Sequence, residues 1–306
     1  MTAGAPRRRK TGRAAPAKRT TARRGAPPRS PAPARRGRPV GAEASGDRPR
    51  RRPPSELGGD QVEGRQAVRE LLAAGRRPVR RVWMVEGQDP SPQLDEIEAL
   101  AARRRVPIES VSRGRLDGEA RTDAPQGVLA FARPVDPVAL EDLARPPRSG
   151  PAPFLVVAAG VTDPRNLGAL LRAAEGAGVT GVVLARHRAA HLSPTVTKVA
   201  AGAIEHLEFA VVGGVPTALE ELRRAGVWTV GLAGESPRSL YDLSIGTEPV
   251  ALVVGAEDKG LAPLVRRRCD EVVRIPQHGT LPSLNVGAAT AVACFEVARQ
   301  RMAAAG

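Results

Sequence analysis

Two polar side chains of one predicted helix, Asn166 and Arg172, have residue types and a spacing suited to holding a phosphate or a ribose. They lie in the segment DPRNLGALLRAAEGAGV, which begins at Asp163. Asp163 is a favoured N-cap and Pro164 suits the first helical position, so Asn166 falls in the first turn. Backbone N–H groups point outward there, and a helical arginine leans back toward the helix start, which places Arg172 near Asn166. A solvated helix face is the alternative explanation for Arg172.

The same predicted helix has an apolar stripe that fixes which side faces the core. The stripe comprises Leu167, Leu170, Leu171 and Ala174. Gly168 and Arg172 are four residues apart and share a face, which we expect to be exposed. The missing side chain at Gly168 then leaves room beside the guanidinium.

A second polar loop, VALVVGAEDKGLAPL, follows an apolar run. Gly255 and Gly260 bracket Glu257, an arrangement in which the backbone can wrap closely around a small ligand. The loop has neither the GxGxxG pattern of dinucleotide-binding enzymes nor the GxxxxGK[ST] pattern of phosphate-binding loops. A first helical turn, in which Glu257 favours the helix dipole, is the alternative explanation.

The third polar loop is IPQHGTLPSLNVGAATAVACFEVARQ, residues 275–300. Ser283 or Asn285 can cap the helix that begins near residue 285, and capping alone would explain both residues. Pro276 and Pro282 stiffen the approach to that helix. A stiff polar backbone beside a helix start suits recognition of a polar cofactor.

The histidines and cysteines do not form a metal-binding pattern. His187 and His191 are four residues apart, but the glutamate of an HExxH motif and a nearby cysteine cluster are missing, so we expect no metal site. The two cysteines, Cys269 and Cys294, exclude a disulfide scaffold and are expected to be buried small apolar residues.

Five apolar runs after residue 153 predict the sheet that positions the three loops: FLVVAAG, GVVLAR, WTVGLAG, VALVVG and EVVRIP. Runs without polar alternation are typical of parallel strands buried on both faces. Helices are predicted at about 165–178, 195–205, 216–225, 261–268 and 285–302. Ligands of such sheets bind outside the carboxyl ends of the strands, where the strand-to-helix loops lie.

Residues 56–135 predict a smaller α/β domain, followed by a linker at 136–152 with one weak helical turn. The segment QVEGRQAVRELLAAG is expected to form a helix closed by Gly75, with four apolar residues on one side: Val62, Val68, Leu71 and Leu72. Strand patterns follow in VRRVWMVEG, VPIESV and QGVLAFARP.

The first 54 residues hold 17 Arg and Lys against Glu43 and Asp47, which is a net charge of +15 and equals that of the whole chain. With almost no large apolar side chains, residues 1–55 are expected to be a disordered basic tail. Such a tail can bind RNA phosphates as an electrostatic tether, or it can serve as a solvated arm that keeps the protein soluble. It can also be attracted to an anionic membrane. Without a run of about 20 apolar residues or a signal-peptide core, the protein is expected to be cytoplasmic.

Taken together, the three loop segments resemble the motifs of the SpoU/TrmH-type RNA ribose 2′-O-methyltransferases of the SPOUT class. The likeness covers residues 153–306. Residues 56–133 more loosely resemble the L30e-like domain for binding the RNA substrate that precedes the catalytic domain in many relatives. In that domain a histidine often comes before the Gln-Gly pair, whereas Pro125 precedes Gln126 here.

The resemblance implies a parallel α/β sheet with a C-terminal trefoil knot, a homodimer formed through the C-terminal domain and S-adenosyl-L-methionine as cofactor. The implied cofactor contacts are Gly255, Ile275 and Leu284. The residues implied to surround the target ribose are Asn166, Arg172, Glu257, Ser283 and Asn285. Because the pKa of arginine exceeds about 12, Arg172 is expected to hold the substrate phosphate and ease formation of the alkoxide rather than act as a base.

The form of the motifs favours the branch that methylates a guanosine ribose in 23S rRNA. A tRNA ribose methyltransferase and a non-catalytic RNA-binding protein on the same fold are the alternatives. A nucleotide-dependent enzyme of Rossmann type is disfavoured, because the first strand is not followed by a glycine fingerprint.

Overall fold

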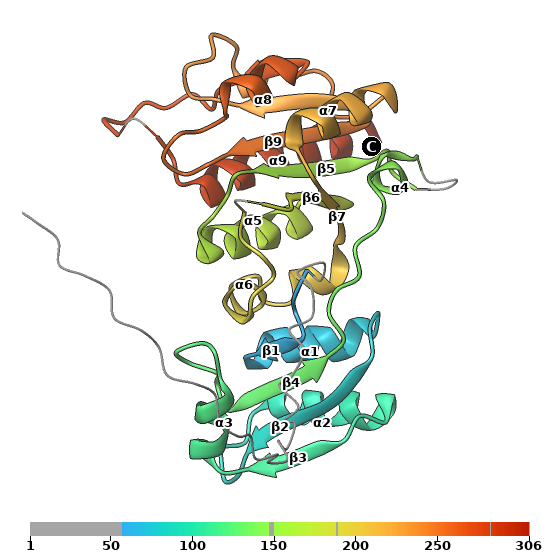
Figure 1. The fold of residues 1–306 in the computed structure, drawn as a ribbon, viewed down its shortest axis with the longest axis vertical. Helices are drawn as coiled ribbons and strands as arrows, with labels where there is room; N and C mark the ends of the chain where they lie inside the picture. Colours follow the sequence, from blue (N-terminus) through green and yellow to red (C-terminus); the bar gives the residue numbers. More distant parts are fainter. Residues whose placement is uncertain (1–56, 147–149, 188, 282, 306) are drawn as a thin grey trace, which may run out of the picture. The chain divides into compact units, whose positions relative to one another are not determined.

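The computed structural model describes residues 57–146, 150–187, 189–281 and 283–305 (Figure 1). The predicted basic tail lies outside these residues. The described residues belong to one compact unit, which holds two β-sheets.

The first sheet is four-stranded, mixed in direction and ordered β1-β4-β2-β3. Its elements are β1 (Gln61–Glu63), α1 (Arg65–Ala74), β2 (Val79–Val85), α2 (Pro92–Arg104), β3 (Ile108–Val111), α3 (Arg113–Glu119) and β4 (Val128–Ala132). β4 runs antiparallel to both β1 and β2, whereas β3 runs parallel to β2. Side chains of α1 and α2 cover one face, and Leu116 of α3 packs on the other.

The helix predicted from residue 61 begins instead at Arg65, so the prediction was wrong for its first residues. Gly64 has a φ of 97°, which ends β1 and turns the chain before the helix starts. Val62 still enters the predicted core, but from the strand. Gly75 caps the helix in the left-handed conformation, and this confirms the predicted end.

The second sheet is six-stranded, parallel throughout and ordered β10-β8-β9-β5-β6-β7. Its strands are β5 (Phe154–Ala159), β6 (Gly181–Ala185), β7 (Glu208–Val212), β8 (Trp228–Leu232), β9 (Val250–Gly255) and β10 (Glu271–Val273). Its helices are α5 (Pro164–Gly176), α6 (Pro194–Val199), α7 (Val215–Arg224), α8 (Pro263–Arg268) and α9 (Val286–Ala305), with 3-10 turns η1 (Ala203–His206) and η2 (Leu240–Asp242). The parallel sheet predicted from the apolar runs is thus confirmed.

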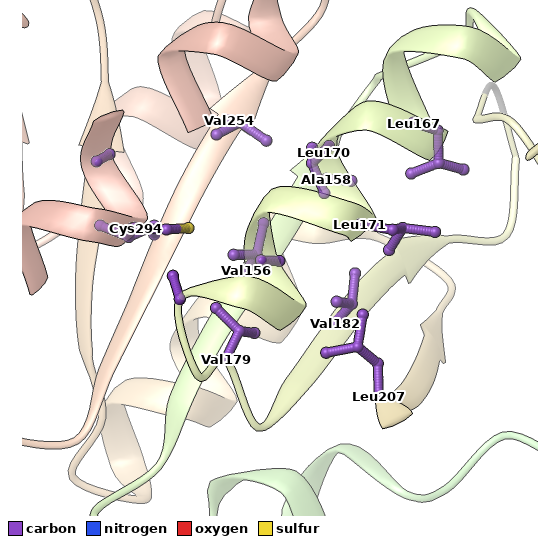
Figure 2. Close-up of a cluster of buried hydrophobic side chains, with 14 of the residues drawn as sticks. Val156, Ala158, Leu167, Leu170, Leu171, Val179, Val182, Leu207, Val254 and Cys294 are labelled. Carbon is purple, nitrogen blue, oxygen red and sulfur yellow. The ribbon is translucent and has the colours of Figure 1, made fainter. Parts of the chain in front are cut away.

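Alternate residues of the central strand β5 enter two different cores. Val156 and Ala158 pack with α5 and α9 on one face, and Figure 2 shows them beside Leu170 and Cys294. Leu155 and Val157 pack with α7 and α8 on the other face. Both faces of the sheet are therefore covered, as strands without polar alternation require.

Two segments depart from the predicted elements. The edge strand β7, which begins with Glu208, was not predicted. The helix predicted at 195–205 is two pieces, because Ala201 and Gly202 have positive φ angles of 52° and 94°. The helical turn predicted in residues 136–152 is present as α4 (Leu140–Ala144), and it buries Leu140, Leu143 and Ala144 in the core of the larger sheet.

Contacts between the small and large sheets centre on arginines that follow α1. The side chains of Arg77 and Glu205 form an ion pair at 2.6 Å and are 9% and 4% exposed. Arg76 donates to the carbonyl oxygens of Glu205 and Leu207 at 3.2 Å. A single β-bridge joins Gly58 to Leu192.

Candidate active site

A chain of side-chain hydrogen bonds joins the three polar loops. Asn285 Nδ2 donates to Asn166 Oδ1 at 2.8 Å, and Asn166 Nδ2 donates to Glu257 Oε1 at 3.2 Å. The backbone N–H of Asp163 also donates to Glu257 Oε1, at 3.2 Å. Residues more than 90 positions apart are thereby fixed in one polar network, here called the Asn–Glu network (Asn166, Glu257 and Asn285).

Helix caps fix the orientation of this network. The Asp163 carboxylate accepts from the backbone N–H groups of Arg165 and Asn166 at 2.7 and 3.0 Å, which starts α5. Asn285 Oδ1 accepts from the backbone N–H groups of Gly287 and Ala288 at 2.9 and 3.4 Å, which starts α9. Asn285 therefore caps its helix, and the cap leaves its Nδ2 to donate to Asn166.

Glycines allow the second loop to fold back tightly after β9. Ala256 and Gly260 exchange two backbone hydrogen bonds of 3.0 and 2.9 Å. A Cβ at Gly255 would collide with the backbone of Gly260, so a side chain is not tolerated at this position without a shift of the loop. Gly260 itself has a φ of 60°. The turn presents Glu257 toward Asn166.

A cavity of about 240 Å³ opens beside the network, at the carboxyl ends of β8 and β9. It is lined by all three predicted cofactor contacts, namely Gly255, Ile275 and Leu284, and by the predicted ribose-site residues Glu257 and Ser283. Its walls are otherwise mainly small or apolar. Glu257 thus belongs to both the cavity and the Asn–Glu network.

Three cavity residues were not predicted, namely Leu232 at the end of β8 and Ala233 and Gly234 directly after it. They come at the carboxyl end of a correctly predicted strand, where the rule for parallel sheets places ligands. That rule could have found them, but they carry no polar side chain to draw attention.

Hydrogen bonds keep Glu257 ionised. Partial burial acts to raise its pKa, but hydrogen bonds from its own backbone, from Asn166 and from the backbone of Asp163 and Thr162 together hold the pKa below its ordinary value of 4.5. At neutral pH the cavity therefore has a negative charge at its rim, which favours a cationic ligand group or a hydroxyl donor.

Arg172 is the one predicted site residue that lies elsewhere. It borders a separate hollow of about 290 Å³ with Gln66, Glu70, Glu175 and His206. Among the residues that the structure describes, none forms a hydrogen bond or an ion pair with the Arg172 side chain. In particular, no hydrogen bond joins the guanidinium of Arg172 to Asn166.

The expectation that Gly168 lies exposed beside Arg172 was wrong. Gly168 is buried, and a Cβ there would lie 2.6 Å from Cβ of Val199. The missing side chain allows α5 and α6 to pack closely instead of leaving room for the guanidinium.

The cysteines match the prediction that they are packing residues. Cys294 is buried in the core and Cys269 is half-buried. Burial raises the pKa of each thiol to about 12, with a further contribution from Asp270 at Cys269. Within the described ranges, potential metal ligands do not gather in groups of three or more. The helices of the same ranges are all too short or too polar to span a membrane.

Two family profiles match the chain. Residues 153–295 match the SpoU rRNA Methylase family, and residues 61–138 match the family described as RNA 2′-O ribose methyltransferase substrate binding. The chain is 39% identical over 245 residues to the 23S rRNA (guanosine-2′-O-)-methyltransferase RlmB of Pseudomonas putida, covering 79% of this chain and 97% of that protein. The enzyme of the same name from Escherichia coli is 37% identical over 242 residues, covering 79% and 99%.

Solved structures agree with this fold. A crystal structure of an RNA 2′-O ribose methyltransferase covers 79% of this chain and 88% of its own, at 27% identity and a TM-score of 0.66. The SpoU methyltransferase AviRb of Streptomyces viridochromogenes, in complex with the cofactor AdoMet, has the same fold at 24% identity, with a TM-score of 0.65 and 79% and 90% covered. With relatives matched over nearly their whole length and the methylase profile on the larger sheet, the chain belongs to the SpoU rRNA methylase family.

Proposed function

We propose that this protein transfers a methyl group from S-adenosyl-L-methionine to the ribose 2′-hydroxyl of a guanosine in 23S rRNA. The observation that carries this proposal is that one carboxylate, Glu257, belongs both to the cavity of about 240 Å³ and to the Asn–Glu network. Glu257 thus borders both the proposed cofactor site and the proposed site for the ribose that accepts the methyl group. The names of the relatives supply the substrate class and the target nucleotide.

The lining of the cavity suits the cofactor. The backbone at Gly255, Ile275 and Leu284, with the small residues after β8, can enclose the adenosine, while Glu257 favours the positive charge of the sulfonium. When bound, S-adenosylmethionine would supply an electrophilic methyl group to the ribose oxygen, leaving S-adenosylhomocysteine, and the hydroxyl proton would pass to solvent.

The residues of the Asn–Glu network position the ribose. Glu257 is ionised and can accept a hydrogen bond from a ribose hydroxyl, and Ser283 can donate to the same sugar. Asn166 holds Glu257 through a bond of 3.2 Å and is itself held by Asn285 at 2.8 Å, so the Glu257 carboxylate is already ordered before the ribose binds. Because Arg172 is exposed and has no partner among the described residues, its guanidinium can hold a phosphate of the substrate beside the separate hollow.

The proposal includes the remaining features of the family. Residues 56–135 are an L30e-like RNA-binding domain, 136–152 a linker and 153–306 the methyltransferase domain, whose C-terminal segment forms a trefoil knot. The protein acts in the cytoplasm as a homodimer. The dimer is supported by the apolar side chains that α9 exposes, since Phe295 and Met302 are 51% and 67% exposed. Sedimentation of the purified protein at twice the monomer mass tests it.

Transfer of labelled methyl groups to unmodified 23S rRNA and to bulk tRNA, by wild type and by Arg172→Ala, tests the proposed function. We expect label in 23S rRNA, mapped to one 2′-O-methylguanosine, and loss of more than 90% of it in the variant. Label in tRNA alone would show that the substrate is tRNA instead of 23S rRNA. Cofactor binding without label in purified or partly assembled ribosomal RNA would favour a non-catalytic RNA-binding role.

A further inference from the structure

The small sheet has a polar hollow of about 400 Å³ that is separate from the candidate active site. Its lining consists of Arg65, Gln88, Gln93, Arg113 and Gln126. These residues lie just after β1 and β2, at the starts of α2 and α3 and just before β4. Two of the five are cations, and none is acidic.

Neutral acceptors hold the guanidinium of Arg65 in place. Its Nε, Nη1 and Nη2 atoms donate to Gln126 O, Ser91 Oγ and Gln88 Oε1 at 3.2, 3.1 and 3.2 Å. The backbone N–H of Arg65 donates to Gln126 Oε1 at 3.0 Å. These bonds order the side chain before a ligand arrives, but none of them neutralises its charge.

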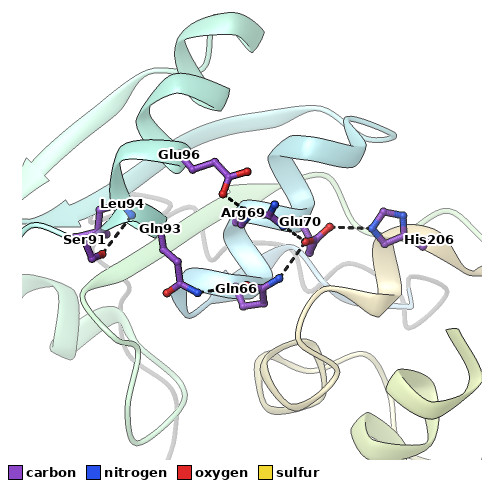
Figure 3. Close-up of polar contacts among 8 residues, drawn as sticks. All are labelled: Gln66, Arg69, Glu70, Ser91, Gln93, Leu94, Glu96 and His206. Carbon is purple, nitrogen blue, oxygen red and sulfur yellow. Dashed lines mark hydrogen bonds and ion pairs between the residues drawn. The ribbon is translucent and has the colours of Figure 1, made fainter. Parts of the chain in front are cut away.

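A neighbouring arginine shows the contrast. Arg69, one turn further along α1, is bound to the carboxylates of Glu70 and Glu96, and Figure 3 shows both contacts. The same figure shows Ser91 and Gln93 at the start of α2, beside Gln66 of α1. The charge of Arg69 is compensated by these carboxylates, whereas no carboxylate of the described residues pairs with Arg65.

Arg113 adds a second charge to the hollow. Its side chain is exposed and, within the described ranges, lacks an ion-pair partner. The amide groups of Gln88, Gln93 and Gln126 supply both donors and acceptors, which suits a ligand that carries an anion beside hydroxyl groups. A phosphodiester with its ribose has that combination.

We infer that this hollow binds a backbone phosphate of the substrate RNA, with Arg65 and Arg113 on the phosphate and the glutamines on the adjoining ribose. The inference rests on the proposed function, since it takes the ligand to be the RNA that is methylated. Planar guanidinium groups bind phosphate through paired hydrogen bonds. A phosphate contact sets the position of the RNA without reading its sequence.

Kinetics of the full-length protein test this site. The variants are Arg113→Gln, which removes one charge, and Arg65→Lys, which keeps the charge but loses the planar fork. Arg103→Gln is the matched control, because Arg103 is exposed at the end of α2, outside the hollow. Methylation of a 23S rRNA transcript gives KM and kcat, and binding of that transcript at several salt concentrations gives the salt dependence. Cofactor affinity and thermal unfolding show that each variant is folded.

For Arg113→Gln we expect KM for RNA to rise roughly tenfold at unchanged kcat, and the slope of log affinity against log salt to fall by about 1. For Arg65→Lys we expect a similar rise in KM with the slope kept. Wild-type KM and slope in both variants, or equal effects in Arg103→Gln, would overturn the inference. If the wild type methylates neither RNA class, the proposed function fails, and the binding slopes alone still decide whether the hollow holds a phosphate.

Discussion

The two sheets of this protein build their polar sites in different ways. In the larger sheet every strand runs in the same direction, so the loops that follow β5 and β9 open at one edge, where the loop before α9 joins them. In the small sheet β4 runs against its neighbours, and the hollow combines residues that follow β1 and β2 with a residue that precedes β4. In a fully parallel sheet, a site can therefore be located from the sequence, because it lies in the loops that follow the strands. In a mixed sheet, loops before and after strands can share one site.

The largest effect is expected where the two sheets meet. Arg77→Met leaves Glu205 buried without its ion-pair partner, which should lower the free energy of unfolding by about 3–5 kcal/mol. Denaturant unfolding measures this loss. The double variant Arg77→Met with Glu205→Met should recover most of it, since no buried charge remains. A small loss in the single variant would show that the pair does not join the two sheets.

A substitution in the loop from Gly255 to Gly260 should impair the cofactor cavity of the larger sheet and leave the hollow of the small sheet intact. Because a side chain at Gly255 meets the backbone of Gly260, Gly255→Val should weaken cofactor binding by about 10- to 100-fold. Gly279→Ala is the control, since a Cβ at Gly279 meets no other atom within 4 Å. Calorimetric titration with S-adenosylmethionine measures both. Equal affinities in the two variants would mean that the cavity is not the cofactor site.

Arg301 should stabilise the larger sheet without acting in its site. It donates to the carbonyl oxygens of Gly246 and Ala152 at 2.8 and 2.7 Å and lies over the ring of Phe154 at 4.9 Å. Arg301→Ala should cost roughly 2–3 kcal/mol of unfolding free energy. Arg299→Ala, which removes a largely exposed guanidinium from the same helix, should cost under about 1 kcal/mol. Similar losses in both variants would contradict this role.

A pH titration should show a small effect confined to the Asn–Glu network. The folded-state pKa of Glu257 lies below 4.5, so its hydrogen bonds stabilise the fold above pH 4.5 and are lost as the pH falls through the lower value. The difference in unfolding free energy between wild type and Glu257→Gln should stay constant from pH 7 to pH 5 and shrink only below pH 4.5. A difference that already shrinks near pH 6 would mean that hydrogen bonds do not keep the pKa of Glu257 below its ordinary value.

The sequence predicted the parts of the larger sheet that depend on local patterns. Apolar runs identified five of its six strands, and the cap Asp163 located the start of α5. The family resemblance implied that residues of the three loops surround one ribose, and the structure brings Asn166, Glu257 and Asn285 together.

Features that depend on packing between distant segments could not be predicted. Gly168 has no side chain because α6 approaches it, which the spacing along α5 does not show. The hollow around Arg65 also escaped sequence reasoning, because its residues come from four separate loops of a mixed sheet. The role of Arg172 remains a prediction, since its guanidinium lies outside the cavity and the Asn–Glu network.

The most direct test of the proposed site is single-turnover methyl transfer to 23S rRNA by Asn166→Ala, together with its affinity for S-adenosylmethionine. Asn166 belongs to the Asn–Glu network but does not line the cavity, so it separates ribose positioning from cofactor binding. We predict a rate lower by about 100-fold with cofactor affinity unchanged within about twofold. A wild-type rate would contradict the claim that this network positions the ribose.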